Sequence, residues 1–232
     1  MTNTINRNEL FPIYIRMSDI HALIVGGGNV ALEKFSAILS NAPQARIHIV
    51  APLVKPEIIH LIEKHPTCRY SQRTFQLKDL EDIHLVFLAT DDPLLHKEIK
   101  SEASKKHLLV NTADTPDLCD FYLSSIVQKG NLKIAISTNG MSPTLAKRIK
   151  EMLSSVIPDE INQSLDQLYK IRSGLKGDFE YKIKTLNKLT SNMATPAHTY
   201  SEGKISSKKI FFGFLLLAIG FALALLYKKI MP

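Results

Sequence analysis

Small or polar residues directly follow a short apolar run in four separate stretches of the chain, and this repeated pattern constrains the fold most. The apolar runs cover residues 22–25, 47–50, 85–88 and 108–110, and the endings cover 26–31, 51–52, 89–92 and 111–114. If each run is a strand of one parallel sheet, all four endings meet at one edge of that sheet. Open α/β sheets bind their ligands at that edge. The pattern therefore predicts where a binding site lies before any motif is considered.

Helical patterns alternate with these runs over residues 30–40, 56–64 and 93–106. In the first of them Ala31, Phe35, Ile38 and Leu39 share one face. Alternating strands and helices predict a parallel sheet that is covered on both faces. We therefore expect an α/β fold, with a Rossmann-like parallel-sheet domain over residues 1–113.

The pattern changes after residue 113. Two strand-like runs, 121–128 and 132–138, flank Lys129-Gly130-Asn131, which is typical of a hairpin turn. Ser142 followed by Pro143 is typical of a helix start, with Ser142 as the N-cap. We expect a hairpin segment over 114–150, a small helical domain over 151–193 and a polar linker over 194–209.

An uncharged apolar stretch of 18 residues, 210–227, follows this linker. As a helix it spans roughly 27 Å, close to the thickness of bilayer hydrocarbon, and lysines flank both of its ends. A buried helix of a soluble protein would show a polar face instead. The N-terminus carries no secretory signal. These features predict a single-pass C-terminal transmembrane helix, with the preceding domains in the cytoplasm.

The net charge of +7 admits an anionic membrane, an acidic substrate or nucleic acid as a partner. The sequence contains no arginine-rich stripe with interleaved aromatic residues, so we expect no nucleic-acid partner. The eight histidines and two cysteines show no spacing typical of metal ligands, so we also expect no resident metal site.

The segment Gly26-Gly27-Gly28-Asn29-Val30-Ala31 fits the G-x-G-x-x-G/A pattern between a strand and a helix. Gly26 and Gly28 permit a tight turn and a close approach to a pyrophosphate, and the helix N-terminus then meets the negative charge. The alternative is a glycine-rich turn without a ligand. An acidic residue that would hold the ribose is missing after the second run, and backbone groups of 52–54 could replace it.

Acidic residues follow the third and the fourth apolar run. Thr90, Asp91 and Asp92 could contact the nicotinamide half of a dinucleotide, or Asp92 could cap the next helix. Asp114 could transfer protons at the same edge, an effect typically worth about 10²–10⁴-fold in rate, or it could form an Asx turn before Thr115-Pro116.

Taken together, several segments resemble the precorrin-2 dehydrogenase/sirohydrochlorin ferrochelatase family, the N-terminal module of siroheme synthase. The resemblance covers roughly residues 10–170. The segments with the most specific likeness are 50–52 (VAP), 118–121 (LCDF) and 136–146 (ISTNGMSPTLA), and the others are 11–14 (FPIY), 23–31 (LIVGGGNVA) with Lys34, 89–92 (ATDD) and 110–114 (VNTAD).

This resemblance implies a homodimer with an NAD domain, a dimerisation segment and a helical domain. It implies NAD-dependent oxidation of precorrin-2, a tetrapyrrole, to sirohydrochlorin, and in some members insertion of Fe²⁺ to give siroheme. Asp114 falls on the family's catalytic aspartate, and Thr138 falls on a substrate-side hydroxyl position. The positions that fall on NAD contacts are Asn29, Val30, Leu53 and Val54, which join Gly26, Gly28, Ala31, Thr90 and Asp91 in the expected cofactor site.

A second hypothesis is a membrane-tethered regulatory module that senses NAD without catalysis. The hairpin with the helix start at Ser142-Pro143, together with Asp114, favours the enzyme, because a sensor needs neither. Whether the chain inserts iron stays open, since the sequence contains no separate cluster of metal ligands.

Overall fold

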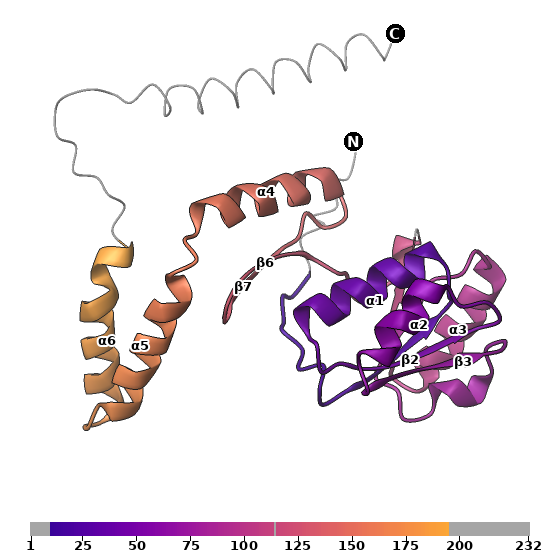
Figure 1. Ribbon diagram of the computed structural model, residues 1–232, viewed down its shortest axis with the longest axis horizontal. Helices are drawn as coiled ribbons and strands as arrows, with labels where there is room; N and C mark the ends of the chain where they lie inside the picture. Colours follow the sequence, from indigo (N-terminus) through magenta and orange to yellow (C-terminus); the bar gives the residue numbers. More distant parts are fainter. Residues whose placement is uncertain (1–9, 114, 195–232) are drawn as a thin grey trace, which may run out of the picture. The chain divides into compact units, whose positions relative to one another are not determined.

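The computed structural model describes residues 10–113 and 115–194. The chain divides into two compact units, with the boundary between Gln167 and Leu168. The larger unit contains a five-stranded sheet and a separate two-stranded hairpin. Figure 1 shows both, together with the helices that follow them.

The five-stranded sheet is parallel and has the order β3-β2-β1-β4-β5. The four expected runs form β1 (His21–Val25), β2 (Arg46–Ala51), β4 (Leu85–Leu88) and β5 (Leu109–Thr112). The fifth strand, β3 (Cys68–Gln72), is not predicted by the sequence pattern. Only Cys68 in β3 is buried, because this strand lies at the edge of the sheet, and its order comes from pairing with β2. The Rossmann-like sheet is thus confirmed, with one polar edge strand added.

Helices cover both faces of this sheet. On one face, α1 (Asn29–Asn41) and α2 (Pro56–Glu63) pack against alternate side chains of β1 and β4, such as Ile24 and Phe87. On the other face, α3 (Pro93–Lys105) and the 3₁₀ turn η1 (Leu77–Leu80) pack against the intervening side chains, such as Leu23 and Val86. The buried residues of α1 are the four that the helical pattern predicts to face the core: Ala31, Phe35, Ile38 and Leu39.

After β5, a short 3₁₀ turn η2 (Pro116–Leu118) leads to the hairpin of β6 (Ser125–Lys129) and β7 (Leu132–Ile136). Lys129 pairs with Leu132, and Gly130 has φ +57°, so Gly130 and Asn131 form the turn. The helix α4 (Pro143–Val156) packs on this hairpin and buries Ala146. Ser142 caps α4, because its Oγ accepts a hydrogen bond from the Leu145 amide at 3.2 Å.

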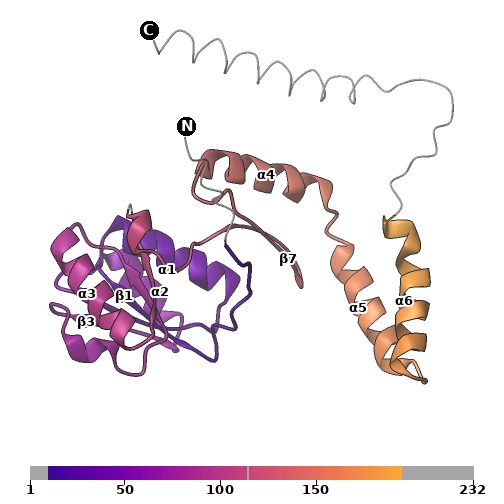
Figure 2. The same ribbon diagram turned by 180° about the vertical axis from the view of Figure 1, so that it is seen from behind.

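The second compact unit contains the end of α5 (Ile161–Gly174) and the whole of α6 (Phe179–Ala194). Both views show α5 and α6 side by side (Figures 1 and 2). Asp178 caps α6 through a 2.8 Å hydrogen bond from the Tyr181 amide. Gly177, with φ +123°, reverses the chain between the two helices.

The expectation of a transmembrane helix, and of a membrane location, needs correction. A helix that spans a bilayer needs about 20 predominantly apolar residues. Within 10–113 and 115–194, every helix is too short or too polar for this, including the 16-residue α6 with its lysines. The predicted segment 210–227 lies outside the described residues. The transmembrane helix is therefore withdrawn from the fold assignment.

Candidate functional site

The loops at the carboxyl ends of the strands are hydrogen-bonded to one another in sheet order. The Gly26 amide donates to Val50 O at 2.9 Å, the Ala89 amide to Val25 O at 2.8 Å, and the Ala113 amide to Leu88 O at 3.1 Å. The loops after β1, β4 and β5 are thus each hydrogen-bonded to the strand that stands before their own in the sheet order, which is β2, β1 and β4 respectively. The four predicted endings meet at one edge, as the sequence pattern requires.

The glycine turn at this edge leaves no room for side chains at its first two positions. Gly26 has φ +121°, and a Cβ there would lie 2.2 Å from Ala89 O. A Cβ on Gly27 would lie 2.1 Å from Leu53 O. At Gly28, by contrast, no atom lies within 4 Å of the Cβ position, so a ligand can approach the backbone there.

Gly28 is the N-cap of α1, and its carbonyl accepts the first helical hydrogen bond, from the Leu32 amide at 3.0 Å. The first amides of a helix have no partner within the helix and carry partial positive charge. The first turn of α1 contains no acidic residue that would compete for them. The amides of the predicted residues Asn29, Val30 and Ala31 therefore suit a phosphate group.

Lys55 adds a positive charge to this helix end, and the sequence reasoning missed it. Its Nζ donates to Asn29 Oδ1 at 2.7 Å and lies 3.6 Å from a carboxylate oxygen of Glu57. Its amide donates to Gly27 O at 3.0 Å. The sequence feature that could have identified Lys55 is its position. It lies directly after the loop that follows β2 and before Pro56, the first residue of α2.

The loop after β2 brings Leu53 and Val54 against the glycine turn. The Leu53 carbonyl and the Val54 Cα are the nearest atoms to the Cβ position of Gly27. The Leu53 side chain is 81% exposed, whereas Val54 packs partly buried against the core. The loop therefore offers an exposed apolar side chain and backbone groups, but no carboxylate, beside the glycine turn.

The contacts of the loop after β4 show whether Asp92 caps a helix or faces a ligand. Its Oδ1 accepts from the amides of Leu94 and Leu95 at 2.9 and 3.0 Å, so Asp92 is the N-cap of α3. Thr90 Oγ1 shares a 2.8 Å hydrogen bond with Nε2 of His96. Burial lowers the pKa of His96, although Asp92 and Asp91 oppose this, so the ring is neutral at pH 7 and fixes the Thr90 side chain. Asp91 is exposed at the same edge.

At the end of β5, Asn111 and Thr112 are buried and Ala113 is half-buried. Asn111 Oδ1 accepts from Lys34 Nζ of α1 at 2.7 Å. The buried Thr112 Oγ1 has no hydrogen-bond partner among the described residues. Asp114, the predicted catalytic residue, lies outside the described residues.

Two features of this edge fit a dinucleotide. The first is the open space at Gly28 beside the first amides of α1, and the second is the Thr112 hydroxyl, which is unpaired among the described residues and which a polar ligand atom could satisfy. The expectation of no resident metal stays a prediction.

A hollow of about 420 Å³ lies between α1, the end of β5 and the start of α4. Its lining includes Lys34, Asn111, Tyr122, Ser124 and Pro143. Thr138 lies in the turn before α4, where its Oγ1 accepts from the Ser142 amide at 3.1 Å. Among the described residues, no hydrogen bond joins Thr138 to the glycine turn, so its substrate-side role stays a prediction.

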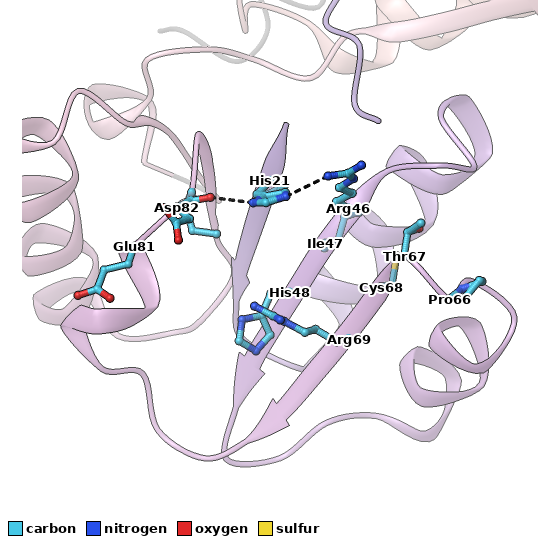
Figure 3. Close-up of a pocket in the computed structure, with 12 residues that line it drawn as sticks. His21, Arg46, Ile47, His48, Pro66, Thr67, Cys68, Arg69, Glu81 and Asp82 are labelled. Atoms are coloured by element: carbon cyan, nitrogen blue, oxygen red, sulfur yellow. Dashed lines mark hydrogen bonds between the residues drawn. The ribbon is translucent and has the colours of Figure 1, made fainter. Parts of the chain in front are cut away.

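A second hollow, of about 490 Å³, lies at the opposite edge, by the amino ends of β1, β2 and β3 (Figure 3). There His21 Nδ1 donates to Asp82 O at 2.9 Å, and Nε2 accepts from Arg46 at 3.5 Å. These contacts join the starts of β1 and β2 to the turn before β4. We assign them a structural role, because ligands of such sheets bind at the carboxyl ends.

Comparison with known proteins shows the family of this chain. Residues 13–125 match the family model "Putative NAD(P)-binding", and residues 129–155 match "Sirohaem biosynthesis protein central". The chain belongs to the family of the siroheme synthase N-terminal module. The "Siroheme synthase" of Psychrobacter cryohalolentis is 36% identical over 76% of this chain and 32% of its own length. That of Nitrosomonas europaea is 29% identical over 74% of this chain and 36% of its own length.

The chain thus spans about a third of the length of these curated relatives. A solved structure of similar size also matches, "SirC, precorrin-2 dehydrogenase". It has 29% sequence identity and a TM-score of 0.64, and the match covers 78% of this chain and 89% of that chain. The family expected from the sequence segments is therefore confirmed.

Proposed function

We propose that this protein is an NAD-dependent precorrin-2 dehydrogenase, which oxidises precorrin-2 to sirohydrochlorin in siroheme biosynthesis. One observation carries the proposal: a precorrin-2 dehydrogenase structure matches this chain over 89% of its own length. The open space at Gly28, at the carboxyl edge of the sheet, supports the choice of cofactor.

The dinucleotide is held at this edge by residues of three loops. Gly26 and Gly28 shape the turn, and the amides of Asn29, Val30 and Ala31 with the Lys55 ammonium bind the pyrophosphate. Backbone groups at Leu53 and Val54 replace the missing ribose-binding carboxylate, and Thr90 and Asp91 lie toward the nicotinamide half. When bound, NAD supplies the hydride acceptor.

Removal of a hydride from precorrin-2 must be accompanied by loss of a proton, and Asp114 accepts this proton. Asp114 follows Ala113 directly, and the Ala113 amide is held by Leu88 O at the cofactor edge. The substrate carries many carboxylates, and Lys34 lines the hollow beside the end of β5. We assign this hollow and Thr138 to the substrate side.

We also propose that the protein is a homodimer formed through the hairpin and α4. The hairpin packs on α4, but β6 and β7 form a sheet of only two strands, so each has an edge whose backbone groups can pair with another strand. Leu145, Met152 and Val156 of α4 are exposed, and Val156 is 71% exposed. A second copy of this chain would cover these side chains and extend the β6-β7 sheet.

Anaerobic incubation of the full chain with NAD and precorrin-2 tests the activity. We expect NADH and the sirohydrochlorin spectrum to appear together, at equal molar amounts. Asp114→Ala should lower kcat by about 10²-fold or more while NAD still binds. Asp117→Ala, in the same loop, is the matched control and should turn over like the wild type.

If NADH does not form although NAD binds, the sensing hypothesis replaces the enzyme. Iron insertion needs its own assay, in which Fe²⁺ or Co²⁺ is added to sirohydrochlorin with and without protein. Metal insertion no faster than in the protein-free control would restrict the protein to dehydrogenation.

A further inference from the structure

The segment Cys119–Phe121 lies along β5, which is the edge strand opposite β3 in the sheet. The Asp120 amide donates to Val110 O at 2.7 Å, and Asp120 Oδ2 accepts from the Val110 amide at 2.8 Å. Asn111 Nδ2 donates to Phe121 O at 2.9 Å. The chain thus leaves β5 after Thr112, and residues 120 and 121 bind the strand that it left.

The Cys119 sulfur closes the base of this loop. The Thr112 amide donates to Sγ at 3.2 Å, and the thiol lies 3.3 Å from Thr112 O and 3.5 Å from Thr115 O. Thr112 and Thr115 stand on the two sides of Asp114 in the sequence. One side chain therefore contacts both flanks of the segment that carries the proposed proton acceptor.

The returning segment is itself anchored to the rest of the domain. Asp120 Oδ1 pairs with Lys100 Nζ of α3 at 2.5 Å, and the two side chains are 32% and 21% exposed. The Phe121 ring packs edge to face on the core residue Phe87, with 5.4 Å between the ring centres. The two residues after Cys119 are therefore tied to α3 on one face of the sheet and to Phe87 on the other.

We propose that Cys119 and Asp120 are positioning residues, which hold the loop over 113–118 so that Asp114 meets its proton donor. This inference rests on the proposed function, because it takes Asp114 as the proton acceptor. A misplacement of about 1 Å can cost about 10²-fold in rate, so a contact at the base of the loop matters even though it touches no substrate. A hydroxyl is a poor replacement, because its C–O bond is shorter than C–S and it cannot reach Thr112 and Thr115 equally.

The test compares Cys119→Ala and Cys119→Ser with Cys68→Ala in the full chain. Cys68 is the other of the chain's two cysteines and is buried at the start of β3, so its variant reports a general loss of packing. We expect Cys119→Ala to lower kcat about 10- to 100-fold, with KM and NAD affinity within about twofold of wild type. Cys119→Ser should recover part of kcat, and Cys68→Ala should leave kcat unchanged.

Hydrogen exchange supplies a readout that does not depend on turnover. The amides of Ala113 and Leu118, which donate to Leu88 O and Thr115 O, should exchange at least about tenfold faster in Cys119→Ala and Asp120→Asn, with those of α1 unchanged. In an Asp114→Ala background, Cys119→Ala should lower the residual rate no further, since the two changes act on one step.

Unchanged exchange in the loop, or an undiminished kcat in Cys119→Ala, would overturn the positioning role. So would an equal loss of kcat in Cys68→Ala. If the wild type itself fails to oxidise precorrin-2, the proposed function fails, and the exchange rates alone then decide whether Cys119 and Asp120 hold the loop.

Discussion

Replacement of Gly28 by alanine separates the binding role of the glycine turn from its role in folding. Gly28 has φ −89° and ψ −158°, which an alanine adopts without strain, and no atom lies within 4 Å of the added Cβ. The methyl group would occupy the open space through which a pyrophosphate approaches the α1 amides. We therefore expect Gly28→Ala to fold normally and to bind NAD poorly.

The size of the effect follows from the hydrogen bonds that the methyl group prevents. A hydrogen bond to a charged group contributes about 1.5–3 kcal/mol, so the loss of one weakens NAD binding roughly 10- to 150-fold. The unfolding free energy of Gly28→Ala should equal that of the wild type or exceed it by about 0.4–1 kcal/mol, because alanine reduces the entropy of the unfolded chain.

Gly27→Ala is the matched control with the opposite expectation. Its Cβ would lie 2.1 Å from Leu53 O and 2.9 Å from Val54 Cα, and both are backbone atoms that cannot rotate away. Overpacking of about 1–3 kcal/mol should lower Tm by about 2–12 °C. Thermal unfolding and calorimetric titration with NAD measure both quantities. The assignment of the open space at Gly28 to the pyrophosphate would be refuted if Gly28→Ala binds NAD as tightly as the wild type. It would also be refuted if the Tm of Gly28→Ala is as low as that of Gly27→Ala.

Three further predictions concern single side chains. Asp92→Ala removes the N-cap of α3 and should lower the unfolding free energy by about 0.5–2 kcal/mol in chemical denaturation, whereas Asp92→Asn should retain most of it. Thr112→Val replaces a buried hydroxyl that is unpaired among the described residues by a methyl group, and it should stabilise the ligand-free protein by about 1–3 kcal/mol; a loss of stability would show that the hydroxyl has a partner. The pKa of His48 is lowered by burial, then by Arg69, so below pH of about 6.5 the unfolded chain binds more protons than the folded one. Stability should therefore fall as pH decreases from about 7 to 5, and His48→Gln should reduce this slope in unfolding curves measured across that range.

Much of the fold could be read from local patterns. The buried strands β1, β2, β4 and β5 are apolar because parallel sheets are covered on both faces, so their pattern is strong. The edge strand β3 has no such pattern, since only Cys68 is buried and its pairing with β2 supplies the order. The strand-like run at 121–128 also begins too early, because residues 119–121 bind the edge of β5 before the chain enters β6 at Ser125.

The site was predictable in its location but not in its contacts. The carboxyl ends of parallel strands lie at the same edge of a sheet. Four apolar runs that each end in small or polar residues therefore predict one edge for ligand binding. Whether Asp92 caps a helix or faces a ligand is a matter of one side-chain torsion, and the structure shows the cap. Lys55 reaches Asn29 across 26 positions of sequence, and no local pattern encodes that approach.

The sequence by itself determined the alternation of strands and helices, the glycine turn and the family, because each depends on residues that are adjacent or regularly spaced. Only the tertiary structure decided which glycine faces open space and which faces the backbone of another loop. It also decided that one sulfur contacts both flanks of the loop after β5. Such contacts depend on how separate segments pack within a few tenths of an ångström, and the order of residues along the chain does not fix that distance.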